Sequence, residues 1–356
     1  MLNTLTDLDR SLFYAVNRDT KNIVFDYVMP ILSWEYLWIP ILAVIFLFII
    51  QLGYAQPVPN VDENIPFLMT FGKESGISWG DDDFSQAFFF FIPDEYDQPF
   101  FIRVFDPDTG GEIDEIAGQF NTRQVFEVYG GDKVWTDPDA RETSPEGNYK
   151  SGTLLASRAF AENPRYDNSW YSFGPFNPAQ GEYTDIWNGR IFKVICEGVA
   201  GDDGNMYRYF LSTDADQNRP IEGANAFAYE YSFRMHNNTE EVAHIYPYIQ
   251  EGTRSVKISN FDWDKDGSIV VISVARQGSD VNISAEDHWA YDELRVQDEE
   301  IGTSFDFRFV KAVPLVKNNN VVVNVRNQFD ETLPFYTIPI GGVPKYQGEV
   351  EFVPLE

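Results

Sequence analysis

The longest apolar run of the chain, Trp38–Ile50, has the sequence WIPILAVIFLFII and separates two unlike parts of the sequence. It spans 13 residues, which is shorter than the ~20 residues of a membrane-spanning helix and closer to the apolar core of a signal peptide. The small residues Gly53 and Ala55, placed just before Gln56, fit a signal-peptidase cleavage site. An uncleaved anchor, lengthened by Val28–Leu37, is the alternative.

Both alternatives place residues 56–356 outside the cytoplasm. The basic residues Arg10, Arg18 and Lys21 all precede the apolar run, and positive charge favours the cytoplasmic side of a membrane. We therefore expect an exported protein in the periplasm, at the cell surface or in the medium. Any membrane attachment would run through residues 37–55, and residues 1–55 form a leader separate from the folded part.

Three segments at the start of the chain, LDRSLFYAVN, FDYVMPILS and WIPILAVIFLF, follow one another within the first fifty residues. This opening resembles the N-terminal segment of PAP2-type membrane lipid phosphatases. The resemblance implies phosphatase chemistry only where the family's histidine motifs are present. The three histidines, His236, His244 and His288, do not lie in such motifs, so a membrane phosphatase fragment is only a remote alternative.

The charge of the chain is strongly negative. It carries 56 acidic and 26 basic side chains and a formal net charge of −30, which repels nucleic acid and anionic lipid. Such a surface keeps a protein soluble, and some of its carboxylates are also suited to divalent cations. The single cysteine, Cys196, excludes an internal disulfide, and its apolar neighbours predict a buried thiol.

Short apolar and aromatic segments separated by turn residues predict an all-β fold for the exported part. Phe88–Ile92 and Pro99–Phe105 flank the turn PDEYD, and similar segments recur at short intervals to the end of the chain. Residues 132–168 are rich in turn formers and predict a long surface excursion, with a short strand or helix at Thr153–Phe160.

A weak internal repeat predicts tandem β-sandwich units of the jelly-roll kind. FFIRVFDPDTGG at Phe100–Gly111 aligns with VKISNFDWDKDG at Val256–Gly267, including two aspartates and the final glycine. We expect a first unit at residues 56–240 and a second at residues 241–356.

The aspartate-rich loops of this repeat are candidate metal sites. Alternating carboxylates in a tight turn converge on one hard cation, as in the first half of an EF-type loop, and calcium is the expected ion. Position 12 of the second loop is Ser273, not Glu, so the loop is not an EF-hand. Asp-rich β-turns without metal are the alternative. The predicted ligands are Asp262, Asp264 and Asp266 in the second loop and Asp106, Asp108 and Asp114 in the first.

No nucleophile elbow, phosphate-binding loop or dinucleotide fingerprint occurs in the chain. We therefore expect a non-enzymatic envelope or surface protein, stiffened by calcium, that serves adhesion, assembly or glycan binding. Trp135 and Trp170, beside loop-like sequence, are the candidate glycan-stacking residues, although core packing is the commoner use of tryptophan. A secreted polysaccharide hydrolase with paired carboxylates is the alternative.

Overall fold

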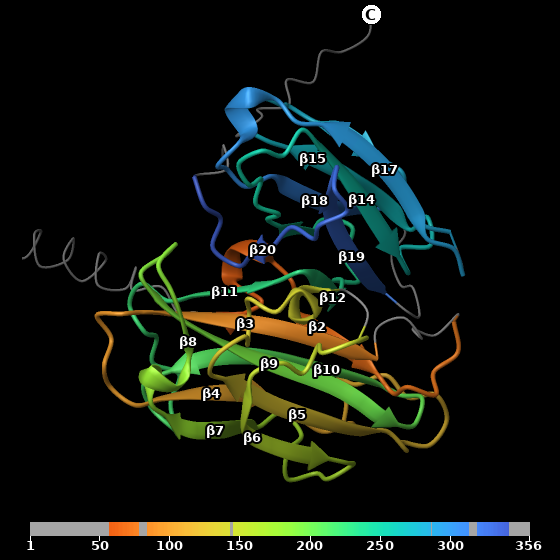
Figure 1. Ribbon diagram of the computed structural model, residues 1–356. Helices are drawn as coiled ribbons and strands as arrows, with labels where there is room; N and C mark the ends of the chain where they lie inside the picture. Colours follow the sequence, from red (N-terminus) through yellow and green to blue (C-terminus); the bar gives the residue numbers. More distant parts are fainter. Residues whose placement is uncertain (1–56, 78–83, 143–144, 286, 313–318, 342–356) are drawn as a thin grey trace, which may run out of the picture. The chain divides into compact units, whose positions relative to one another are not determined.

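The computed structural model describes residues 57–77, 84–142, 145–285, 287–312 and 319–341 (Figure 1). Their regular structure consists of antiparallel strands and short 3-10 helices. Every strand pairing in this part of the chain is antiparallel, and the strands form three sheets. The 3-10 helices are η2 (Val61–Glu63), η4 (Pro138–Arg141), η5 (Pro178–Gln180) and η6 (Asp298–Glu300).

The largest sheet has nine strands in the order β17-β14-β19-β12-β2-β10-β4-β7, with β1 also pairing with β10. Its strands are β1 (Pro57–Val58), β2 (Phe67–Phe71), β4 (Phe100–Phe105), β7 (Trp170–Phe176), β10 (Gly204–Ser212), β12 (Glu230–Arg234), β14 (Ser255–Phe261), β17 (Ala290–Arg295) and β19 (Asn320–Asn327).

A seven-stranded sheet has the order β20-β11-β3-β9-β5-β6, with β8 pairing with β9, and a four-stranded sheet has the order β13-β18-β15-β16. The strands of the first are β3 (Ser85–Pro93), β5 (Arg123–Gly130), β6 (Thr153–Phe160), β8 (Glu182–Thr184), β9 (Gly189–Ala200), β11 (Asn225–Ala228) and β20 (Phe335–Tyr336). Those of the second are β13 (Val242–Ile245), β15 (Gly267–Ile272), β16 (Ser279–Val281) and β18 (Asp306–Lys311).

Aromatic side chains join the seven-stranded sheet to the β2-β10-β4-β7 half of the large sheet. Phe126 of β5 meets Tyr207 of β10 edge to face, with ring centroids 5.3 Å apart, and Phe100 of β4 meets Phe192 of β9 at 4.9 Å. Side chains alternate between the two faces of a strand. Because both faces of β3 are covered, the run of phenylalanines that it contains is continuous and not alternating.

The four-stranded sheet packs in the same way on the other half of the large sheet. Phe309 of β18 meets Phe233 of β12 at 5.2 Å and Trp263, which follows β14, at 6.1 Å. The large sheet thus contributes one layer to each of two sandwiches. In Figure 1 most strands of the first sandwich are coloured from orange to green and those of the second from teal to blue, whereas the blue strand β20 pairs with β11 of the first sandwich.

The predicted all-β, tandem-sandwich fold is confirmed, and Thr153–Phe160 forms a strand, β6. The division predicted at residue 240 lies between β12 and β13. Pairing of β12 with both β2 and β19 continues the large sheet from one sandwich into the other, and the described residues belong to one compact unit.

The predicted leader and the segments that resemble PAP2-type phosphatases lie outside the described residues. Within those residues, no helix has the length and apolar character needed to cross a membrane. Cys196 on β9 is fully buried, as predicted, and burial raises the pKa of its thiol to about 12. The thiol therefore packs as a small apolar group.

Candidate metal centre and binding groove

The loop that follows β4 carries two of the predicted ligands into the protein interior. Asp106 and Asp108 are 1% and 0% exposed. Asp106 has a left-handed backbone (φ 53°), and its N–H donates to the carbonyl of Ser169 at 2.9 Å. This hydrogen bond joins the loop to the segment just before β7, which is β4's neighbour in the sheet.

That neighbouring segment supplies a third carboxylate. One oxygen each of Asp106, Asp108 and Asp167 lies within 4.8 Å of the others. The Oδ2 atoms of Asp106 and Asp108 accept the N–H groups of Asn168 (3.0 Å) and Asn163 (2.6 Å). Their Oδ1 atoms are buried and have no hydrogen-bond partner in the described part of the chain. Buried carboxylate oxygens without a partner are costly unless a cation or proton compensates them.

The electrostatics of these three side chains favour a hard cation. Burial, together with the neighbouring carboxylates of Asp108 and Asp167, raises the pKa of Asp106 to about 7. Burial likewise raises the pKa of Asp108 to about 6, again with a contribution from Asp167. Carboxylate oxygens are the ligands that calcium and magnesium prefer. The three aspartates therefore form a cluster able to hold a metal ion.

Asp114, the third ligand predicted for this loop, has a different role. Its Oδ2 accepts the N–H of Gly110 and its Oδ1 the N–H of Met206, both at 2.7 Å. Both oxygens are thus occupied in holding the loop against β10. Asp167 takes the predicted place of Asp114, and no sequence spacing pointed to it because it lies on a separate loop.

The second aspartate loop does not form a comparable cluster. In the described residues, the only three acidic groups that come within 4.8 Å of one another are those of Asp106, Asp108 and Asp167, so Asp262, Asp264 and Asp266 do not converge. The hydroxyl of Ser284 accepts the N–H of Trp263 at 2.8 Å and that of Asp264 at 3.3 Å. The Ser284 hydroxyl therefore holds the backbone of this turn, which is compatible with the alternative of an Asp-rich turn without metal.

The two predicted stacking tryptophans lie in different surroundings. Trp135 is only 9% exposed; its Nε1 donates to Tyr229 at 2.8 Å, and its ring packs on Trp187. It is therefore a core residue and not an open platform. Trp170 is half-buried, with the guanidinium of Arg103 over its ring at 5.2 Å.

A groove lies on the large sheet, on the outer face of the part that belongs to the second sandwich. It has a volume of about 600 Å³, within the ~300–1,000 Å³ typical of ligand sites. The strand register explains its lining: Ser259 on β14 lies opposite Tyr291 on β17 and Asn324 on β19, and Asn324 lies opposite Glu230 on β12. Four strands thus present one continuous row of side chains.

The aromatic side chains at β17 lie beside polar side chains of β14, β19 and β12 in this groove. Trp289 stacks on Phe261 with ring centroids 5.3 Å apart and lies beside Tyr291 at 6.5 Å. Tyr291 is 53% exposed. Lys257 lies over the Tyr291 ring, and Arg326 pairs with Glu142 at 3.0 Å. The outward-facing residues of β14 and β17 lie apart in the sequence, and only the pairing of these two strands brings them together as one site.

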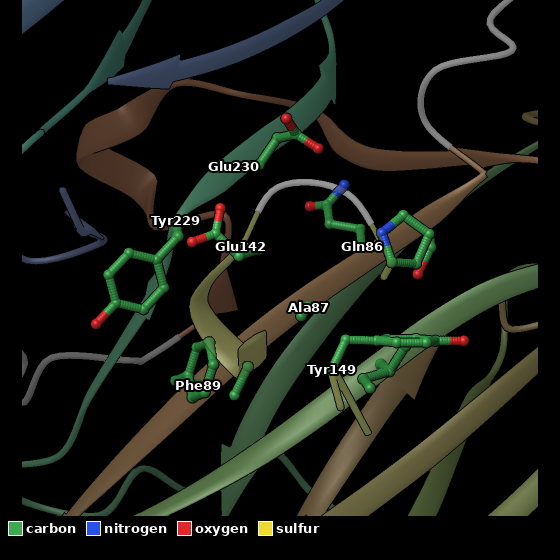
Figure 2. A pocket seen from close by; sticks show the side chains of 11 residues that line it. Gln86, Ala87, Phe89, Glu142, Tyr149, Tyr229 and Glu230 are labelled. Atoms are coloured by element: carbon green, nitrogen blue, oxygen red, sulfur yellow. The ribbon is translucent and has the colours of Figure 1, made fainter. Parts of the chain in front are cut away.

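A small side pocket adjoins the groove, because Pro145 and Glu230 line both. Its volume is about 30 Å³. Figure 2 shows the polar groups of Glu142, Glu230 and Gln86 on one side of it and the rings of Phe89 and Tyr149 on the other. The Oε1 atom of Gln86 is buried and has no hydrogen-bond partner in the described part of the chain.

No protein-family model matches the chain, and no curated protein sequence matches it. Among solved structures, the N-terminal CBM22-1–CBM22-2 tandem domain of Xyn10C from Paenibacillus barcinonensis aligns with 70% of this chain and 78% of its own, at 10% identity and a TM-score of 0.14. The Macrobrachium rosenbergii nodavirus structure aligns with 74% of this chain and 88% of its own, at 9% identity and a TM-score of 0.15. At TM-scores this low, neither structure bears on the fold or function of this chain.

Proposed function

We propose that this protein is an exported, non-enzymatic glycan-binding protein whose fold is stiffened by calcium. The observation that carries the proposal is the groove across β12, β19, β14 and β17, where Trp289 and Tyr291 lie beside hydrogen-bonding side chains. A sugar offers an apolar ring face and a rim of hydroxyls. An aromatic surface beside amide, hydroxyl and charged groups complements both.

The remaining surface argues against other large ligands. A net charge of −30 opposes nucleic acid and anionic membranes. An exposed tyrosine beside a half-buried tryptophan in such an acidic protein favours a ligand that gains from apolar contact and does not depend on charge.

Calcium would act on the first sandwich and not in the groove. Asp106 and Asp108 belong to the loop after β4, whereas Asp167 belongs to the loop before β7. A cation bound by all three would cross-link two loops that are far apart in the sequence. Such a cross-link stabilises the folded state because the unfolded chain lacks the assembled site.

A polysaccharide hydrolase is the second candidate, favoured by the two carboxylates of Glu142 and Glu230 in the side pocket (Figure 2). Both already have partners: Glu142 pairs with Arg326 at 3.0 Å and Glu230 accepts from Asn324 at 3.1 Å. We expect no release of reducing ends from any polysaccharide that the protein binds. Release that is abolished by Glu230→Gln would establish the hydrolase instead.

The experiment that tests glycan binding compares two tryptophan variants by affinity electrophoresis in gels that contain xylan, mannan or mixed-linkage glucan. Trp289→Ala should lose at least tenfold in affinity, because truncating an aromatic anchor typically costs ~2 kcal/mol or more. Trp170→Ala, a half-buried tryptophan of the first sandwich, is the matched control and should bind as the wild type does. Equal retardation of all three proteins, or a loss in Trp170→Ala alone, would contradict the proposed site.

A further inference from the structure

We propose that the groove binds a neutral, linear polysaccharide that runs across the strands from Tyr291 toward Glu230, with one sugar hydroxyl in the side pocket beside Gln86. This inference rests on the proposed function. It adds the chemical class of the glycan, its direction on the sheet and the length that the groove accommodates.

The direction follows from the strand register. Tyr291, Ser259, Asn324 and Glu230 lie opposite one another on four successive strands. Neighbouring strands are ~4.8 Å apart, so this row extends over roughly 14 Å between its first and last strand. A linear chain of pyranose rings advances by a similar step per sugar. A ligand that follows the row therefore places about one sugar on each strand, or about four in all.

The preference for a neutral ligand follows from the contacts that the charged side chains of the groove already make. Arg326 is paired with Glu142 at 3.0 Å and also donates to the carbonyl of Asp330 at 2.8 Å. The Lys257 ammonium lies over the Tyr291 ring at 4.9 Å. Acidic and basic side chains therefore line the groove together, and the chain as a whole carries a net charge of −30. That charge opposes the approach of a polyuronate, whereas sugar hydroxyls both donate to and accept from such a mixed set.

The side pocket provides a specific acceptor. Gln86 Nε2 donates to the carbonyls of Met69 (3.1 Å) and Ser232 (2.9 Å), which fixes the amide orientation. Its Oε1 is left buried and without a partner in the described residues. A volume of about 30 Å³ accommodates a hydroxyl or hydroxymethyl group but not a sugar ring. A hydroxyl that enters would donate to Gln86 Oε1 and satisfy it.

Calorimetric titration with an oligosaccharide series tests the inference. The series runs from disaccharide to hexasaccharide and is prepared from whichever neutral polysaccharide is retained in the gels. Affinity should rise with each sugar up to about the tetrasaccharide and then level off. Tyr291→Ala should bind the tetrasaccharide about tenfold more weakly. The control Tyr183→Ala, also an exposed tyrosine but on β8, should leave binding unchanged.

The outcomes separate the two proposals. Failure to bind any of the polysaccharides overturns the proposed function itself. Binding that does not strengthen beyond the disaccharide overturns the run across four strands. Polygalacturonate bound as tightly as the neutral polysaccharide at low salt overturns neutrality. Tetrasaccharide affinity that stays constant between low and high salt, together with weak polygalacturonate binding, supports the inference.

Discussion

Replacing Asp108 by Asn tests the candidate metal centre because it removes one charge and almost no volume. The Asn163 N–H now donates to Asp108 Oδ2 at 2.6 Å, and the amide oxygen of Asn can accept it equally well. Two unit charges separated by 4.8 Å, the upper limit of the distances in this cluster, repel by ~3.5 kcal/mol at an effective dielectric constant of ~20. Asp108 has two such neighbours, Asp106 and Asp167. Partial protonation and salt reduce this repulsion, so we expect Asp108→Asn to stabilise the metal-free protein by roughly 1–2 kcal/mol.

Calcium should reverse this order of stability. An ion present at a hundred times its dissociation constant stabilises the folded wild type by ~2.7 kcal/mol. Asp108→Asn offers a neutral oxygen in place of a carboxylate and should lose most of that gain. The wild type should therefore unfold at lower urea than the variant in EGTA, and at higher urea than the variant in calcium.

The assay is urea unfolding followed by tryptophan fluorescence, in EGTA and in calcium, above the pKa of about 7 at Asp106. Asp114→Asn is the control. Asp114 accepts backbone N–H groups with both oxygens, so losing one acceptor should cost ~1–3 kcal/mol in both conditions. A wild type whose unfolding is the same in EGTA and calcium would refute the metal centre. An Asp108→Asn variant destabilised equally in both would show that the carboxylate serves only the loop.

Two further predictions concern a buried lysine and the leader. Lys193 is 0% exposed, and burial lowers the pKa of its ammonium from 10.5 to about 8. Between these two pH values the unfolded chain binds more protons than the folded protein, so the folded wild type becomes more stable as the pH rises. Its free energy of unfolding should increase by up to ~3 kcal/mol relative to Lys193→Met as the pH increases from about 8 to 10.5. A difference in urea unfolding that does not change with pH would contradict this prediction. Mass spectrometry of the mature N-terminus should find Gln56 or its cyclised form, whereas an intact Met1 would establish an uncleaved anchor.

The fold class followed from the sequence because strand patterning is local. Phe88–Ile92 lies within β3, as its β-forming residues indicate, whereas the choice between strand and helix at Thr153–Phe160 is made by its pairing with β5. The continuity of the large sheet was not predictable in this way. It depends on the pairing of Phe233 with Leu68 and of Ser232 with Val322, residues that are far apart in the sequence. Local sequence patterns do not predict which strands of two similar sandwiches pair with each other.

The binding groove shows the same limit at the level of side chains. Trp135 lies beside loop-like sequence, yet its hydrogen bond to Tyr229 and its contact with Trp187 place it in the core. Trp289 has no distinguishing neighbours in the sequence. It becomes part of a candidate site only because the pairing of β17 with β14 stacks it on Phe261. Exposure of an aromatic residue is set by its long-range partners, which composition and turn signals do not specify.

The two aspartate loops show how long-range partners decide the chemistry of similar local turns. Asp106 and Asp262, at equivalent positions of the repeat, share a left-handed backbone with φ values of 53° and 60°, so the local conformation is alike. At the first loop, the charges acting on Asp106 are the carboxylates of its neighbours. At the second, burial raises the pKa of Asp266 and the ammonium of Lys311, which lies 5.7 Å from the ring centre of Trp263, partly offsets that rise. The second loop thus lies near a cation of the protein, whereas the first gathers a third carboxylate. The same turn therefore belongs to a cluster able to hold a metal ion in one sandwich and is held by the protein's own groups in the other.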